Sequence, residues 1–200
     1  MKYILTSFLF FAYGQFMYAQ DTLKIVPKHT ENKKVDNYTI QRLIVLNDKG
    51  EILMQKNRFG WFTPSIRSNQ NQSLKEGLDS LAKEIGIKIG SIKLVGVFSY
   101  KYNGLSDHIG IVSWRTHYLT KYKSGELIQP KDPKDTTREF KWMKVNEAIE
   151  VINMTALKEE TRQIIKYPKV VWAGSFLLNF ENETFKSADL VEKFYSLSEN

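Results

Sequence analysis

The chain of 200 residues contains no cysteine. It therefore cannot carry a lipoprotein anchor, a disulfide framework or a catalytic thiol, and its stability must come from its hydrophobic core. The sequence also has no apparent internal repeats or low-complexity tracts. Its three histidines, His29, His108 and His117, lie too far apart in sequence to indicate a metal site. We expect each of them to be a surface histidine or a satisfied core histidine.

Positive charge exceeds negative charge, with 29 Lys and Arg against 22 Asp and Glu, but the cations are scattered along the chain. This balance favours solubility and weak attraction to anions, and we expect no nucleic-acid partner. With 42% hydrophobic and 26% charged residues, the chain suits one globular domain of mixed α and β class.

Residues 1–19 differ in composition from the rest of the chain. Lys2 precedes an apolar run that is interrupted by Thr6 and Ser7, and Ala19 offers a cleavage point. This arrangement is typical of a secretory signal peptide, and the run is too short for a comfortable membrane span. We predict export to the periplasm or outside the cell, with no stable membrane span after cleavage. An uncleaved anchor and a docked hydrophobic arm are the alternatives.

Hydrophobic patterning predicts a polar lead-in over residues 20–37 and a folded domain over residues 38–166. The predicted strands cover residues 39–46, 51–55, 92–102, 108–119 and 139–145. Two predicted helices cover 146 to about 152, with Asn146 as the cap, and 157–165. Residues 123–137 are predicted to be a loop. For residues 167–200 we predict a helical extension of the same domain, with turns at 170–178 and 187–195.

A further helix has the clearest start and stop signals. Ser73 and Glu76 form a capping box, in which each side chain satisfies a backbone N–H at the start of a helix. Gly86 can adopt the left-handed conformation that ends one. Between them, four residues at helical spacing form an apolar stripe: Leu74, Leu78, Leu81 and Ile85. The sequence thus predicts an amphipathic helix that begins at about Leu74.

The order of these elements resembles a Nudix hydrolase domain. The resemblance rests on W-x-x-P at residues 61–64, E-x-G-I at the end of the central helix at 84–87, and E-F-x-W-x-x-x-x-E-A at 139–148. It covers about residues 38–166. It implies an α+β fold, namely a Nudix-like α/β/α sandwich around a mixed β-sheet, and hydrolysis of compounds linked to a nucleoside diphosphate.

The family's Nudix box is G-x5-E-x7-R-E-U-x-E-E-x-G-U, where U is bulky and aliphatic. When Gly86 and Ile87 are matched to its end, Leu81 keeps the aliphatic position and Glu84 keeps the last glutamate. The other positions depart from the pattern, with Ser65, Asn71, Asp79, Ser80 and Lys83 in place of Gly, Glu, Arg, Glu and Glu. If the loop is one residue short, Gln72 takes the place of the first glutamate.

These departures bear on metal binding, because the family's box glutamates hold Mg²⁺ or Mn²⁺ against a diphosphate. Ser80, Lys83 and Glu84 stand where three glutamates would, so the formal charge of the site falls from minus three to zero. The Lys83 ammonium also competes with a metal for Glu84. A structural alternative is that Lys75, Asp79 and Lys83 form a charge ladder that stabilises the helix.

The resemblance leaves Glu84 as the candidate metal ligand and Arg58 and Arg67 as candidate phosphate-binding residues. A guanidinium binds phosphate oxygens in a bidentate manner, and by analogy both arginines point toward the substrate cleft. Glu159 and Glu160 lie on a later helix, where we expect a solvated face.

Two functions remain open at this point. One is a Nudix hydrolase with weak or lost activity, which would need Mg²⁺ or Mn²⁺ only if it is active. The other is a catalytically inactive Nudix-fold module that binds a nucleotide, another phosphorylated ligand or a protein partner.

The predicted export has a direct test. Mass spectrometry of the purified protein should find a mature chain that begins near Gln20, because the apolar segment before it would be removed on secretion. An intact Met1 on protein recovered from a soluble cytosolic fraction would contradict export.

Overall fold

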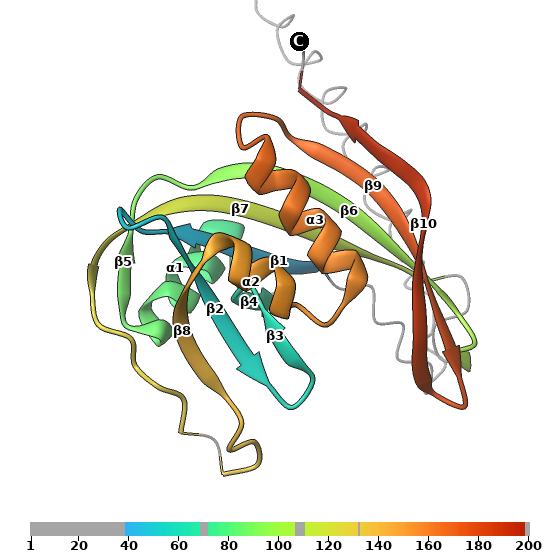
Figure 1. The fold of residues 1–200 in the computed structure, drawn as a ribbon, viewed down its shortest axis with the longest axis horizontal. Coiled ribbons are helices and arrows are strands. Elements are labelled where there is room, and N and C mark those ends of the chain that lie inside the picture. The colour runs from blue at the N-terminus through green and yellow to red at the C-terminus, as the bar shows by residue number, and fades with distance from the viewer. Residues whose placement is uncertain (1–38, 69–71, 107–110, 132, 199–200) are drawn as a thin grey trace, which may run out of the picture. The chain divides into compact units, whose positions relative to one another are not determined.

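The computed structural model describes residues 39–68, 72–106, 111–131 and 133–198, and these belong to one structural unit that spans residues 35–200. The strands of this unit are β1 Thr39–Leu46, β2 Glu51–Asn57, β3 Gly60–Phe62, β4 Ser65–Arg67, β5 Ile87–Ile89, β6 Lys93–Asn103, β7 Val112–Gly125, β8 Glu139–Lys144, β9 Trp172–Glu181 and β10 Thr184–Ser196. The helices are α1 Leu74–Ile85, α2 Val145–Val151 and α3 Thr155–Lys166 (Figure 1). Within the described part of the chain, no helix is both long and apolar enough to cross a membrane.

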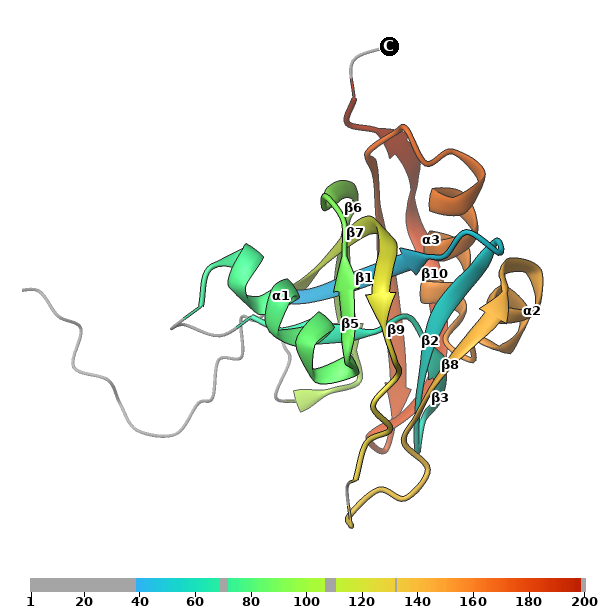
Figure 2. The ribbon, with the colours of Figure 1, turned by 90° about the vertical axis from the view of Figure 1, so that its left-hand side faces the viewer.

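The strands form a mixed sheet with the order β10-β9-β6-β7-β1-β2-β3. Off this path, β4 pairs with β1, β5 with β7, and β8 with β2. The β1–β7 and β6–β9 pairs are parallel, and the other pairs are antiparallel. Figure 2 shows α1 on one side of the sheet and α2 and α3 on the other. The expected α/β/α sandwich around a mixed sheet is confirmed.

Strand β1 is buried on both faces, which explains the apolar run of its second half, residues 43–46. Leu43 and Val45 point into the core beneath α1, whereas Ile44 lies in the core beneath α2 and α3. Successive strand residues point to opposite faces of a sheet, so one short strand supplies both cores. All three side chains are completely buried.

The predicted central helix forms as α1, with the capping box at Ser73 and a left-handed cap at Gly86, where φ is 90°. A side chain at Gly86 would strike the carbonyl oxygen of Glu126 at 2.3 Å, so both space and conformation require glycine there. The predicted apolar stripe needs one correction. Leu78, Leu81 and Ile85 are buried, but Leu74 at the first helical position is 45% exposed.

On the other face, α2 and α3 cover a core built from β1, β2, β6 and β9. Both helices lie close to their predicted positions, but the predicted Asn146 cap is wrong. Strand β8 runs straight into α2, so Lys144 occupies the cap position without a side-chain hydrogen bond and Asn146 lies inside the helix.

The predicted helical extension at residues 167–200 is wrong, because this segment forms β9 and β10. The two strands meet in a turn at Asn182 and Glu183, which have positive φ values of 49° and 61°. A Glu at positive φ gives no hairpin signal in the sequence. Pairing of β9 with β6, and packing of Phe194 against Phe98 at 5.6 Å between ring centroids, favour strands here.

Strand β7 also differs from its prediction. It continues to Gly125, into the stretch predicted as a loop, because β5 pairs with its far end. Trp114 on this strand is 49% exposed. The beginning of the predicted strand, with His108 and Ile109, lies outside the described residues.

The burial of α1 makes a prediction about stability. Replacing Leu81, which is 4% exposed, by Asp places an unpaired charge in the core and should cost more than about 3 kcal/mol of unfolding free energy. The matched change Leu74→Asp, at an exposed position in the first turn, should shift it by less than about 0.5 kcal/mol. Denaturant unfolding of both variants measures the difference, and equal stabilities would refute this packing.

Candidate functional site

The capping box fixes which positions of α1 face outward. The N–H of Ser73 donates to Oε2 of Glu76 at 2.7 Å, and the N–H of Glu76 donates to Oγ of Ser73 at 3.3 Å. The first of these bonds lowers the pKa of the Glu76 carboxyl. At the other end of the helix, the candidate metal ligand Glu84 points outward, with 61% of its side chain exposed.

A cation of the protein itself lies beside Glu84. Nη2 of Arg138 is 3.7 Å from Oε1 of Glu84. The loop that brings Arg138 there is anchored twice, because the N–H of Ile128 donates to the last turn of α1 and the side chain of Gln129 exchanges two hydrogen bonds of 2.9 Å with the backbone of Phe140. The pair is exposed and adds little stability. It does place a guanidinium at the last glutamate of the box.

Besides Lys83, the described residues at the other positions that the resemblance assigns to the box are neutral or paired within α1. Gln72 donates from Nε2 to Oγ of Ser80 at 3.5 Å, whereas Asn71 lies outside the described residues. Lys75 and Asp79 form an ion pair at i,i+4 spacing, as the charge ladder implies. Asp79 is therefore directed to a lysine on its own helix.

This set of donors does not fit a divalent metal. Mg²⁺ and Mn²⁺ favour about six oxygen ligands, and Mg²⁺ is usually held by one or two carboxylates that are free to bind it, together with waters and phosphate oxygens. Across residues 39–68, 72–106, 111–131 and 133–198, no group of three or more His, Asp or Glu side chains could hold an ion. Glu84 offers one carboxylate, and Arg138 lies 3.7 Å from it. No catalytic step through a metal follows from this arrangement.

The two candidate phosphate-binding arginines occupy different parts of the fold. Arg58 lies in the turn between β2 and β3, where its N–H donates to Oδ2 of Asp135 at 3.2 Å and its guanidinium lies 4.8 Å from the centre of the Phe59 ring. Arg67 ends β4, opposite Ile40 on β1. Asp135 and Arg138 belong to the same loop, which thus contacts both Arg58 and Glu84. A phosphate-binding role for Arg58 or Arg67 stays a prediction.

Two surface hollows flank α1 on the side of β5. The larger, of about 540 Å³, is lined by Asp79, Lys83 and Lys88 among others, and the smaller, of about 480 Å³, by Lys75 and Tyr118 among others. Neither hollow includes Glu84, Arg58 or Arg67 in its lining. They are separate from the surface that the Nudix resemblance indicates.

A second polar group lies beneath α3. Nε2 of His117 on β7 is 3.0 Å from Oε2 of Glu160 on α3, and both side chains are completely buried. The expectation that Glu160 faces solvent is therefore wrong. The inward stripe of α3 runs through Ala156, Leu157, Glu160, Thr161 and Ile164, so a glutamate occupies a core position of an amphipathic helix.

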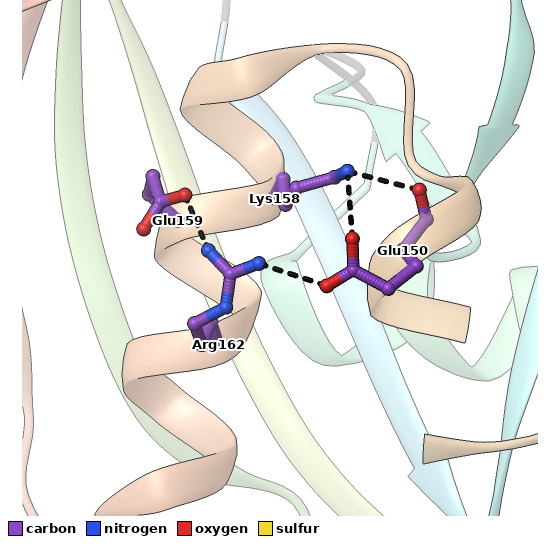
Figure 3. A network of polar contacts seen from close by, with 4 residues as sticks. All are labelled: Glu150, Lys158, Glu159 and Arg162. Carbon is purple, nitrogen blue, oxygen red and sulfur yellow. Dashed lines mark hydrogen bonds and ion pairs between the residues drawn. The ribbon is translucent and has the colours of Figure 1, made fainter. Parts of the chain in front are cut away.

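Glu159, by contrast, lies on the outward face of α3 as predicted. It pairs with Arg162, whose other arm lies 3.1 Å from Glu150 on α2 (Figure 3). Lys158 donates from Nζ to the backbone oxygen of Glu150 at 2.9 Å. The hydrogen bond from Arg162 lowers the pKa of the Glu150 carboxyl. This network joins α3 to α2 at the surface, whereas Glu160 joins α3 to the sheet.

Two arginines accompany the buried pair. In the parallel register of β1 and β7, Arg42 stands opposite His117 and Ile40 opposite Arg115. The Arg115 guanidinium lies 4.8 Å from the centre of the Tyr100 ring. The sequence contains a signal for this cluster that our motif analysis missed. Alternate residues of the buried strand β7, Ser113, Arg115 and His117, are polar and share one face.

The buried histidine makes stability depend on pH. Burial lowers the pKa of His117 below its usual 6.5, although Glu160 beside it opposes this shift. Below about pH 6.5 the unfolded chain therefore binds a proton that the folded chain does not, and stability falls as pH falls, by at most about 1.4 kcal/mol per pH unit. Denaturant unfolding at pH 7.5, 6.5 and 5.5 should show a steeper acid loss for the native chain than for His117→Gln. Equal losses would mean that the fold does not lower the pKa of His117.

Comparison with known proteins places this geometry in a fold family. No protein family model and no curated protein sequence matches the chain. Among solved structures, it is similar to a mutator MutT protein from Bacillus halodurans, with 18% identity, a TM-score of 0.58, and coverage of 77% of this chain and 97% of that one.

Two other structures agree. A NUDIX hydrolase from Nitrosomonas europaea gives 14% identity and a TM-score of 0.53, with 72% of this chain and 80% of that one covered. A MutT protein from Methanosarcina mazei gives 15% identity and a TM-score of 0.50, with coverage of 66% and 94%. With the sheet order, the two-sided helix layers and the capped α1 in place, the chain has the fold of the Nudix hydrolases.

Proposed function

We propose that this chain is a Nudix-superfamily domain in which metal-dependent hydrolysis of nucleoside diphosphate-linked compounds is weak or lost. The observation that carries the proposal is the environment of Glu84. It is the one box glutamate retained, and Arg138 lies beside it at 3.7 Å.

Charge explains why this environment opposes hydrolysis. A diphosphate is an anion, and a hydrolase of this kind needs carboxylates to hold the cations that neutralise its charge. Here the helix supplies Glu84 together with Lys83, and the loop before β8 supplies Arg138. The positive charge at this surface thus comes from the protein's own side chains, Lys83 and Arg138, rather than from bound metal ions. Such side chains attract a phosphate, but they cannot generate a metal-bound hydroxide.

A second candidate function is binding without turnover. The same fixed cations favour an inactive module that binds a phosphorylated ligand, with Arg58 and Arg67 as its candidate contacts. A protein partner is the alternative occupant of this surface. The predicted export adds support, because hydrolysis that cleanses the nucleotide pool has little obvious purpose outside the cytoplasm.

The test of lost hydrolysis measures the release of nucleoside monophosphate by the purified protein from a panel of nucleoside diphosphate-linked compounds, with Mg²⁺ and with Mn²⁺. We expect release equal to that without protein, and no change in Glu84→Gln, because one carboxylate cannot assemble the metal site. Glu147→Gln, an exposed change on α2, is the matched control. Robust metal-dependent release that Glu84→Gln abolishes and Glu147→Gln leaves intact would overturn the proposal. In the absence of release, nucleotide binding that weakens in Arg58→Ala supports the ligand module.

A further inference from the structure

The two hollows beside α1 adjoin one another. Asp79 of the helix and Ile89 of β5 line both of them. The helix residues in their linings run from Leu74, in the first turn, to Gly86, at the cap, which corresponds to a length of about 18 Å. Figure 2 shows β5 beside the helix. The hollows thus form one groove along the whole of α1, which we call the α1–β5 groove.

The end of this groove near the start of α1 is apolar. Leu74 and Leu94 line the hollow there and are 45% and 38% exposed. Ile92 and Tyr118 belong to the same lining. Single exposed leucines are common on protein surfaces, but two that share one hollow offer a place for an apolar group to pack. This place also gives a role to Leu74, the member of the apolar stripe that the core leaves uncovered.

The other end of the groove is positively charged. Lys83 and Lys88 line it, and both side chains are exposed. Among the described residues, no carboxylate pairs with either ammonium group. Asp79, the one acidic residue among the described residues of the two linings, is paired with Lys75. Three lysines against one aspartate leave a net charge of plus two along the groove.

Helix electrostatics account for only part of this charge. A lysine in the last turn of a helix is favoured by the helix dipole, which explains Lys83. Lys88 lies on β5, outside the helix, so the dipole does not explain it. Two exposed lysines on facing walls of one groove favour an occupant with negative charge.

The shape of the groove indicates an extended occupant. A length of about 18 Å matches about five or six residues of extended chain. A compact molecule would fill either the apolar hollow or the charged one, whereas an extended peptide reaches both. Peptide grooves of this kind take one bulky side chain as an anchor and read the rest by charge.

We propose that the α1–β5 groove binds an extended acidic segment of a partner protein. One bulky apolar side chain of that segment packs between Leu74 and Leu94, and its carboxylates lie near Lys83 and Lys88. Exposed ion pairs add little free energy, so the anchor supplies most of the affinity and the lysines supply the preference for acidic sequences. This surface lies apart from Glu84, and the proposal does not rest on the loss of hydrolysis.

The test is an NMR titration of the purified, ¹⁵N-labelled full chain with two synthetic peptides at physiological ionic strength. Each peptide has six residues, with a leucine at one end and aspartates at the other, and the two differ in which end carries the leucine. At least one should bind and shift the amide signals of α1 and β5. Exchange of its leucine for glycine, or of its aspartates for asparagines, should weaken binding by about fivefold.

Matched variants of the protein separate the groove from general attraction to a basic chain. The double variant Lys83→Gln, Lys88→Gln should weaken binding by about fivefold. The control Lys49→Gln, Lys144→Gln removes the same charge from exposed positions at β1–β2 and β8, and should change it less than twofold. Leu74→Ser should weaken binding by about threefold. Leu197→Ser, at a leucine that is 52% exposed near the C-terminus, should leave it unchanged.

Several results would overturn the proposal. They are the absence of binding by both peptides, signal shifts confined to other surfaces, and equal weakening in the two lysine double variants. Titration with decanoate tests a small amphiphilic anion, and shifts of the groove signals by decanoate but by neither peptide would assign the groove to such a molecule instead. Release of nucleoside monophosphate in the hydrolysis assay would refute the loss of activity and leave this binding result standing.

Discussion

The two-sided burial of β1 is the constraint on which the rest of the structure depends. Because Leu43 and Val45 point one way and Ile44 the other, this strand joins the core under α1 to the core under α2 and α3. Its parallel register with β7 then decides which polar side chains meet. A shift of one residue would exchange the faces and bury Gln41 where Arg42 now lies.

The two faces of the sheet differ in how they carry charge. On the α1 side, charged groups lie at the surface and pair weakly across loops, as Glu84 does with Arg138. On the α3 side, the network of Glu150 and Arg162 also lies at the surface. Beneath α3, however, His117 and Glu160 are buried, and their energies are governed by desolvation rather than by screening. The structure therefore has the fold of the Nudix hydrolases, while its buried ion pair lies away from α1.

The polar residues beneath α3 also depend on one another for their contribution to stability. A glutamate at a core position of a helix is destabilising unless cations and donors face it, so Glu160, His117, Arg42 and Arg115 depend on one another. Loss of one member would leave the others buried and uncompensated. The packing of α3 on the sheet and the polarity of this face are thus set by the same residues.

Local structural signals could be predicted from the sequence alone. It determined the capping box at Ser73, the stop at Gly86 and the strand over residues 39–46, because each depends on neighbouring residues or on composition. It also determined which residues stand at the positions that the Nudix resemblance assigns to the box, because this is a matter of residue identity. Tertiary structure alone decided that residues 172–196 form strands, since their apolar spacing fits helix or strand and pairing with β6 settles the choice. It alone placed Arg138 beside Glu84, and it alone brought His117 to Glu160. These contacts join segments far apart in the chain, and no local pattern encodes the register that makes them meet.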